Sequence, residues 1–88
     1  MLSHGDEGYG RLDADDVAAL ARQQGLELLT AQEVADRLRI GKSTVYLLCR
    51  RGELPCLFIN RSVRIPADAL RRWLAERVRA AETAVRGN

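Results

Sequence analysis

The sequence predicts a mainly α-helical fold with one small β-hairpin. Two stretches of helical period fill residues 30–52 and are separated at Gly41, and residues 54–65 alternate between apolar and polar side chains as strands do. Residues 66–81 then return to the helical period. A chain of 88 residues has room for one such domain with tails at most.

The first 27 residues form an acidic N-terminal tail that we expect to be partly helical or disordered. Residues 1–12 are rich in glycine and acids, which is typical of disordered chain. Residues 13–25 could form a short helix, with Asp13 as its N-cap and Gly25 at its end. The thin apolar face of this helix consists of Val17, Leu20 and Ala21. We expect the helix to be marginal unless it docks on the rest of the protein.

Residues 28–80 should form the folded domain, and its first helix begins at a capping box. In TAQE, Thr30 can accept a hydrogen bond from the backbone N–H of Glu33, whose side chain can reach back to the Thr30 N–H. Leu29 can pack on Val34 as a hydrophobic staple. The buried face of this helix is expected to contain Val34, Ala35 and Leu38.

A second helix, KSTVYLLCRRG, follows a tight joint at Arg39–Lys42 and can stop at Gly52. One side of it can pack on the first helix. The apolar residues on that side are Val45, Leu48 and Cys49. The residues on the opposite side are Ser43, Tyr46, Leu47 and Arg50. A leucine therefore stands among hydroxyl groups and an arginine on the face that points away from the core.

The last two elements are a hairpin and a helix. Strands at 54–60 and 62–65 should join at Asn60–Arg61, because Asn tolerates positive φ in a tight turn. Pro66 should begin the helix, since proline suits the first turn. The expected buried stripe consists of Leu70, Trp73, Leu74 and Val78. The pattern could continue through Ala81 and Val85, into a C-terminal helix extension or tail of residues 81–88.

Charge is distributed unevenly along the chain. Residues 1–29 carry two Arg against six acids, residues 30–65 carry seven Lys or Arg against three acids, and residues 66–88 carry five Arg against three acids. Thirteen of the 14 basic residues are Arg, which forms bidentate contacts with phosphate and with guanine edges. The middle of the chain therefore favours an anionic partner, although a solvated basic surface would explain the charge alone equally well.

The composition argues against several other classes of protein. No apolar run approaches the ~20 residues of a membrane span, and residues 1–10 lack the pattern of a secretory signal. We therefore expect a cytoplasmic protein with no membrane partner. Cys49 and Cys56 are expected to be two reduced, buried thiols, and only His4 could join them at a metal, so we expect no metal and no cofactor. The sequence has neither a phosphate-cradling glycine loop nor a Ser/Cys–His pair, and we expect no enzyme activity.

Two short helices with a tight joint, followed by a hairpin with an arginine at its tip, match the plan of a winged helix-turn-helix. In this plan the second helix fits the major groove of double-stranded DNA, and the hairpin reaches the minor groove or phosphates. Arg50 could bind guanine, Ser43 could bond either type of base, and Leu47 could contact a thymine methyl. Arg61 at the hairpin tip and Arg64 on the second strand suit the minor groove or phosphates.

Other interpretations of these side chains stay open. Lys42 and Thr44 lie at the helix start, where backbone N–H groups also favour a phosphate. Arg51 could be a solvated charge that compensates the helix dipole, Tyr46 could pack against the hairpin, and Leu47 could be a lone exposed apolar residue. The predicted DNA-contacting set consists of Lys42, Ser43, Thr44, Tyr46, Leu47, Arg50, Arg51, Arg61 and Arg64.

A family resemblance is carried by the stretch LLTAQEVADRLRIGKSTVYLLCRRGELPCLFINRSVRIPADALRRWL. It resembles the excisionase-type family of small MerR-like winged helix-turn-helix proteins, also called recombination directionality factors. The likeness covers residues 28–75 and rests on LLTAQEVADRL, STVYLL, GELP and ALRRWL in the expected order. It implies DNA contacts in the first turns of the second helix and at the hairpin. Relatives often carry Gly where Arg39 stands and a basic residue where Leu47 stands.

The resemblance implies a sequence-specific DNA-binding excisionase that bends DNA, binds it cooperatively, and helps a tyrosine integrase excise a phage or mobile element. The implied partners are double-stranded DNA, the integrase and further copies of the chain on DNA. Residues 76–86, with Val78, Ala81 and Val85 on one side, are a candidate contact between copies, or else a frayed solvated tail. A small MerR-like transcriptional regulator is an alternative in the same binding class. A protein–protein adaptor without DNA binding is a third interpretation, favoured by the acidic residues 1–29 and by the exposed Leu47.

Overall fold

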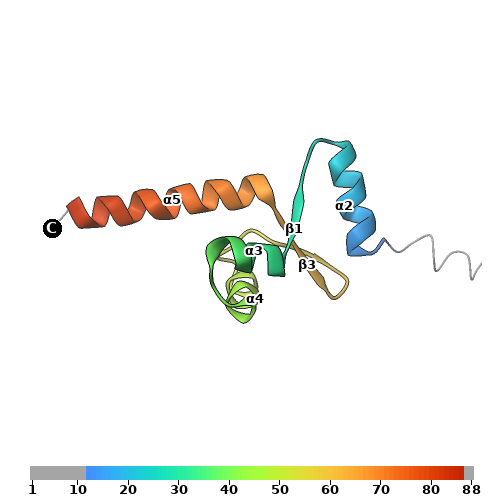
Figure 1. Ribbon diagram of the computed structural model, residues 1–88, viewed down its shortest axis with the longest axis horizontal. Helices are drawn as coiled ribbons and strands as arrows, with labels where there is room; N and C mark the ends of the chain where they lie inside the picture. The colour runs from blue at the N-terminus through green and yellow to red at the C-terminus, as the bar shows by residue number, and fades with distance from the viewer. Residues whose placement is uncertain (1–11, 87–88) are drawn as a thin grey trace, which may run out of the picture.

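The computed structural model describes residues 12–86, so the disorder expected for residues 1–11 lies outside the described part of the chain, as does His4. The elements run in chain order as α2 (Ala14–Gln23), β1 (Leu28–Thr30), α3 (Ala31–Leu38), α4 (Lys42–Arg50), β2 (Leu57–Ile59), β3 (Ser62–Pro66) and α5 (Ala67–Arg86). Figure 1 shows α3 and α4 on one side of the strands, α2 on the other, and α5 projecting away from the body. The prediction of a mainly α-helical winged helix-turn-helix is confirmed.

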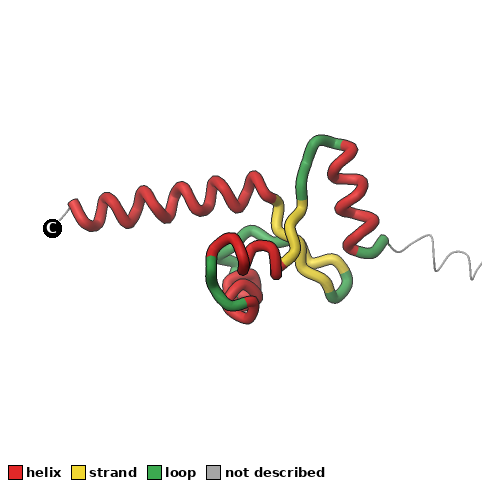
Figure 2. Tube along the Cα trace, in the orientation of Figure 1, coloured by secondary structure: helices red, strands yellow, loops and turns green. Residues whose placement is uncertain are grey.

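The strands form a three-stranded antiparallel sheet in the order β1-β3-β2 (Figure 2). The predicted hairpin is present, with a two-residue turn at Asn60 and Arg61 in which Asn60 adopts φ 56°. The sequence analysis missed β1, because three residues before a helix cap are too few to show an alternating pattern. The segment is a strand because it pairs with the central strand β3, where Leu29 lies opposite Ile65.

One face of the sheet closes the hydrophobic core. Leu29, Val63 and Ile65 point from that face toward α3 and α4, and all three are buried. They meet the inner sides of the two helices, where Val34 and Val45 are fully buried. The predicted inner faces of both helices are therefore confirmed. Leu54, expected to lie in a strand, instead fills the core from the turn that precedes β2.

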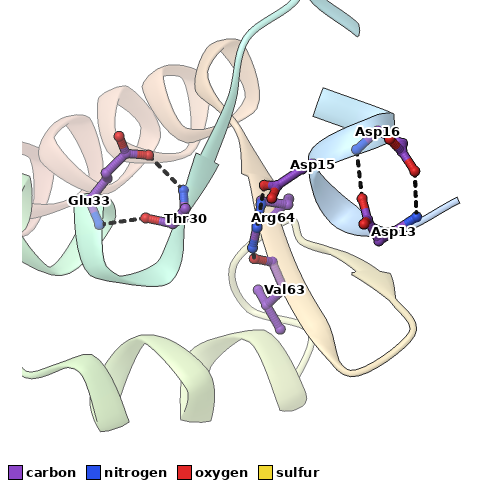
Figure 3. A network of polar contacts seen from close by, with 7 residues as sticks. All are labelled: Asp13, Asp15, Asp16, Thr30, Glu33, Val63 and Arg64. Carbon is purple, nitrogen blue, oxygen red and sulfur yellow. Dashed lines mark hydrogen bonds and ion pairs between the residues drawn. The ribbon is translucent and has the colours of Figure 1, made fainter. Parts of the chain in front are cut away.

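Both predicted N-terminal caps are present (Figure 3). The Thr30 hydroxyl accepts a hydrogen bond from the Glu33 N–H at 3.1 Å, and the Glu33 carboxylate accepts from the Thr30 N–H at 2.8 Å. The same reciprocal pair joins Asp13 and Asp16 at the start of α2, at 2.8 and 3.2 Å. Each pair satisfies two backbone donors that a helix start leaves without partners.

The two helices of the central motif end in the same left-handed turn, built from different residues. Gly52 follows α4 with φ 73°, and the N–H of Glu53 donates to the Leu48 carbonyl at 3.0 Å. Arg39 ends α3 with φ 59° and ψ 44°, and the N–H of the next residue donates to the Ala35 carbonyl at 3.1 Å. In both turns, a carbonyl of the last helical turn that would otherwise lack a partner accepts a hydrogen bond. A residue with a Cβ pays a steric penalty in this conformation that glycine avoids.

The prediction of two reduced thiols is wrong in this structure, which joins Cys49 and Cys56 by a disulfide. Cys49 lies in the last turn of α4, and the chain reverses at Gly52 before it reaches Cys56. Their Cα atoms are 5.7 Å apart, within the range that a disulfide spans. The sequence analysis considered cysteine number and compartment, whereas the pairing depends on this reversal. The bridge ties the end of α4 to the segment that leads into the hairpin.

Two expectations for the last helix need correction. Pro66 ends β3 opposite Leu28 instead of beginning the helix, which starts at Ala67. The predicted buried stripe is interrupted: Leu70 is buried and Trp73 half-buried, whereas the remaining two members, Leu74 and Val78, are exposed. The reason is that α5 leaves the body after about two turns, so the helical period continues along a stretch with no surface beneath it.

Candidate nucleic-acid interface

The face of α4 opposite the core presents three side chains to solvent. Ser43, Leu47 and Arg50 are exposed, and Leu47 has 41% of its surface accessible. Their positions follow from the inner side, because burying Val45 and Cys49 turns residues two positions away outward. The predicted outer face is therefore present, with an apolar side chain at its centre and an arginine near its end.

The start of α4 is open and positively charged. Lys42, Ser43 and Thr44 are all exposed, and the N-cap residue Gly41 makes no side-chain hydrogen bond to the first turn. Backbone N–H groups at a helix start, together with the helix dipole, favour an anion. The Lys42 ammonium lies 6.0 Å from the centre of the Tyr46 ring, which keeps the cation beside this end of the helix.

Two of the predicted contact residues on this helix are engaged within the protein: Tyr46 by packing and Arg51 by an ion pair. Tyr46 is half-buried and packs against the core. Arg51 caps the C-terminus of α4 and lies 3.6 Å from the Glu53 carboxylate. That carboxylate also lies 3.4 Å from Arg77, whose guanidinium stacks 4.9 Å from the Trp73 ring centre. These contacts connect the end of α4 to α5.

The two hairpin arginines lie in different surroundings. Arg61 is exposed at the tip, beside the turn. Arg64 points away from the core face, and only 16% of its side chain is accessible. Figure 3 shows its guanidinium between the sheet and α2, where it donates to the Val63 carbonyl at 2.8 Å and lies 3.5 Å from the Asp15 carboxylate. The sequence analysis could not separate the two, because the partner of Arg64 comes from 49 residues earlier.

α2 lies against the sheet face opposite to α3 and α4. Besides the contact of Asp15 with Arg64, the Asn60 side chain donates to the Leu12 carbonyl at 3.2 Å, so the hairpin turn and the middle of β3 both touch the segment around α2. Asp15 of α2 is thus held at the hairpin, on the side of the sheet opposite to α4 (Figure 1). The helix expected at residues 13–25, which we expected to be marginal unless it docked on the rest of the protein, does dock on the sheet.

Phe58 is an exposed aromatic residue that the sequence analysis did not single out. It lies on the edge strand β2 opposite Val63, so its side chain leaves the sheet on the face that also bears α4. It is 59% exposed, the largest exposed apolar side chain on the hairpin. The alternating pattern gave no signal for this exposure, because Phe58 shares the core-side face with the buried Val63.

The interface consists of cationic, hydroxyl and apolar groups on two neighbouring elements. The segment 42–51 contains Lys42, Arg50 and Arg51 and no acid, and the exposed Arg61 adds a cation at the hairpin tip. Within residues 12–86, no helix is long and apolar enough to cross a membrane. The same described residues contain no cluster of three or more His, Cys, Asp or Glu suited to a metal ion.

Comparison with known proteins places this arrangement among relatives. Residues 28–78 match the family described as helix-turn-helix domain. A Mycobacterium tuberculosis protein, named as a candidate DNA-binding protein in two strains, is 45% identical over 49 residues, covering 56% of this chain and 63% of its own length. A Streptomyces ambofaciens protein named excisionase is 40% identical over 52 residues, covering 59% of this chain and 84% of its own length. This chain therefore spans less than two thirds of the mycobacterial relatives. No solved structure matches it.

Proposed function

This chain belongs to the excisionase-type helix-turn-helix family, and on that premise we propose that it is a sequence-specific DNA-binding excisionase. The observation that carries the proposal is the outer face of α4, where Ser43, Leu47 and Arg50 stand exposed beside an uncapped, cationic helix start. A helix of this kind fits the major groove, which is about 12 Å wide. The protein acts by binding and not as an enzyme.

Three groups of the interface position the protein on the DNA backbone. The open start of α4, with Lys42 and Thr44, receives one phosphate. Arg61 at the hairpin tip reaches a second phosphate or the adjacent minor groove. Arg51, which lies beside Glu53, supplies a third contact at the far end of the helix. These contacts are independent of base sequence and release counterions, so affinity should fall steeply with salt.

Base reading falls to the middle of the α4 face. Arg50 donates to the O6 and N7 atoms of guanine, Ser43 bonds either type of base, and Leu47 packs on a thymine methyl. Tyr46, half-buried beneath Lys42, contributes its ring edge or hydroxyl from the margin of this face. Since relatives often have a basic residue where Leu47 stands, this position gives the protein a base preference of its own.

The hairpin contributes through two residues with different roles. Phe58, exposed on the α4 side of β2, packs against sugar or base edges beside the groove. Arg64 is held by Asp15 and the Val63 carbonyl, so it contacts DNA only when the Asp15 contact opens. In the free protein Arg64 anchors α2 beside the hairpin.

As an excisionase, the protein binds adjacent sites cooperatively, bends the DNA, and presents a surface to a tyrosine integrase that excises a phage or mobile element. A single recognition helix buries little surface and binds weakly, which favours several copies on one DNA. Expression inside the bacterial cell, from a phage or mobile element, follows from that role. The same α4 face would also serve a transcriptional regulator, so the target site decides between the two roles.

The first experiment selects binding sites from random DNA and then titrates salt. We expect a short recovered motif and a fall in affinity of about 40-fold between 50 and 200 mM salt, for three phosphate contacts in one copy. Arg50→Ala should relax the preference at one position by about 1–3 kcal/mol, and Arg61→Ala should weaken binding to all sequences alike. Arg72→Ala, an exposed arginine on α5, is the matched control and should change neither.

The outcomes separate the candidate roles. Absence of DNA binding at low salt would leave the adaptor interpretation. A motif unchanged in Arg50→Ala would remove that residue from base reading. Stimulation of integrase-dependent excision on DNA that carries the motif, together with bending in a circular-permutation assay, supports the excisionase. Binding only at promoter sites, with no effect on excision, supports the regulator.

A further inference from the structure

An open apolar groove lies between α2 and the outer face of the sheet. Its volume is about 380 Å³. The apolar side chains that line it are Val17, Leu20, Leu26, Leu28, Leu57 and Pro66. The face of α2 that the sequence marks as apolar therefore points into this groove, while Ala14 and Ala18 make the closest contact with the body. Leu20 is 48% and Leu26 52% exposed, so the groove presents apolar surface to solvent.

The groove is surrounded by negative charge. Glu27 and Asp68 line it directly, although Asp68 is paired with Arg71 at 2.9 Å, and residues 12–28 carry four acids against one Arg. An apolar floor with an acidic rim fits an amphipathic helix that has cationic residues beside its apolar stripe. Neither a DNA backbone nor an acidic peptide would be accepted there, because both carry the same sign of charge as the rim.

Such a helix exists at the opposite end of this molecule. Beyond its first two turns, α5 carries the exposed residues Leu74, Val78 and Ala81, spaced by four and three positions along one side. Arg71 and Arg77 flank that stripe on the helix surface, each already paired within its own chain, with Asp68 at 2.9 Å and Glu53 at 3.4 Å. Residues 71–84 still carry a net positive charge, with four Arg against two Glu. Figure 1 places this part of α5 at one end of the long axis and α2 at the other.

We propose that the exposed stripe of α5 in one copy of the chain docks in the α2 groove of a second copy. Charge selects this pairing over the two symmetric alternatives. Two α5 stripes would bring basic segments together, and two grooves would bring acidic rims together, whereas α5 against the groove joins opposite charges. Because the two surfaces lie at opposite ends of the molecule, the contact is heterologous and repeats from copy to copy as an open row.

The inference rests on the proposed function in one respect: binding to adjacent DNA sites would raise the local concentration of copies and so promote their contact. Each surface extends outside the stretch that matches the family, although Leu74 and Val78 of the stripe and Leu28, Leu57 and Pro66 of the groove lie inside it. α2 precedes residues 28–78, which match the family, and α5 continues beyond them. A chain that exposes leucine and valine at both of these places has surface that a partner can bury.

Sedimentation velocity of the full chain without DNA tests the contact directly. We expect weight-average mass to rise with protein concentration and to fall again as salt is added. Leu20→Gln in the groove and Val78→Gln on the stripe should each weaken self-association roughly tenfold or more, since each removes buried apolar surface. Leu12→Gln is the matched control: Leu12 is exposed to the same 48% but does not line the groove, and its mass profile should equal that of the wild type.

Mixing the two variants gives the sharpest result. Each variant alone lacks one half of the contact, but the mixture retains one intact groove and one intact stripe. It should therefore form heterodimers and stop there. A contact between two α5 stripes predicts instead that Val78→Gln abolishes association and Leu20→Gln does not; a groove-to-groove contact predicts the reverse. Either of those outcomes, or a mixture that stays monomeric, overturns the proposal.

Two controls address loss of folding and occupation of the groove by the same chain. Circular dichroism confirms that each variant is folded, and Leu26→Gln replaces Leu20→Gln if α2 is lost. Occupation of the groove by residues 1–11 of the same chain predicts a monomer at all concentrations, and that outcome overturns the proposal.

On DNA with a single site, Leu20→Gln and Val78→Gln should bind like the wild type. On two adjacent sites, both should lose cooperativity. Failure of all DNA binding with intact self-association would refute the proposed function alone.

Discussion

Helices cover the two faces of the small sheet to different extents. The inner face carries Leu29, Val63 and Ile65, which α3 and α4 cover fully. The outer face carries Leu57 and Pro66, which α2 covers only in part, leaving an open groove. The inner face therefore holds the fold together, whereas the outer face can lose contacts without unfolding the protein. Only at the edge strand does the inner face also expose a large side chain, Phe58.

The largest expected effect comes from truncating matched positions on the two faces. Ile65→Ala removes a fully buried side chain and should lower the free energy of unfolding by about 2–5 kcal/mol. Leu57→Ala, on the neighbouring strand but 42% exposed, should cost less than about 1 kcal/mol. Urea unfolding followed by circular dichroism measures both. If Ile65→Ala does not fold, Ile65→Val should still cost about 0.5–1.5 kcal/mol. Equal losses at both positions would remove the distinction between the faces.

The disulfide should contribute the next largest amount, entirely on the inner side. Cys49 and Cys56 close a loop of eight residues, and chain entropy predicts about 2.5 kcal/mol of stabilisation for a loop of that length. Cys56→Ser, or reduction of the wild type, should lower the free energy of unfolding by that order. Reducing agent should have no further effect on Cys56→Ser. A wild type that is equally stable with and without reducing agent would contradict the assignment.

The two capping boxes offer a matched pair of smaller effects. Asp13→Ala and Thr30→Ala each remove a cap worth about 1 kcal/mol. Thr30 begins α3, so its loss should lower the stability of the whole domain. Asp13 begins α2, so its loss should release α2 alone, which hydrogen exchange would report as faster exchange in residues 14–23 with the core amides unchanged. Faster exchange throughout the core of Asp13→Ala would show that α2 is part of the cooperative unit.

The smallest effect is expected at the end of α3 and has the opposite sign. Arg39 holds a left-handed conformation that costs a non-glycine residue about 1–2 kcal/mol, whereas glycine pays a smaller entropic cost. Arg39→Gly should therefore raise the free energy of unfolding by about 0.5–1 kcal/mol. Gly52→Ala, at the equivalent position after α4, should lower it by a similar amount, because φ there is 73°. Thermal melting of both variants measures the pair.

Local patterns made the inner face predictable from the sequence. The cap at Thr30, the apolar positions Val34 and Val45, and the Asn60 turn each depend on residues within a few positions of one another. The α4 outer face followed from the same helical period, although its DNA contacts remain proposals. What the sequence analysis missed depends on distant partners or on where an element leaves the body.

Three corrections illustrate that limit. β1 exists because it pairs with a strand more than 30 residues later, and Arg64 is withdrawn from solvent by an acid 49 residues away. Cys49 and Cys56 meet because the chain reverses between them, which their number and compartment do not reveal. In the same way, the period of α5 continues through Val78 without change, so only the structure shows that its stripe is no longer covered.

The bridge between Cys49 and Cys56 has a consequence for how the protein would measure its site. It fastens the end of α4 to the stem of the hairpin, so the two elements proposed to enter neighbouring grooves keep a fixed separation before DNA arrives. Preorganisation of this kind removes an ordering cost from association. A fixed separation of this kind would favour DNA sites with one spacing between the two proposed groove contacts.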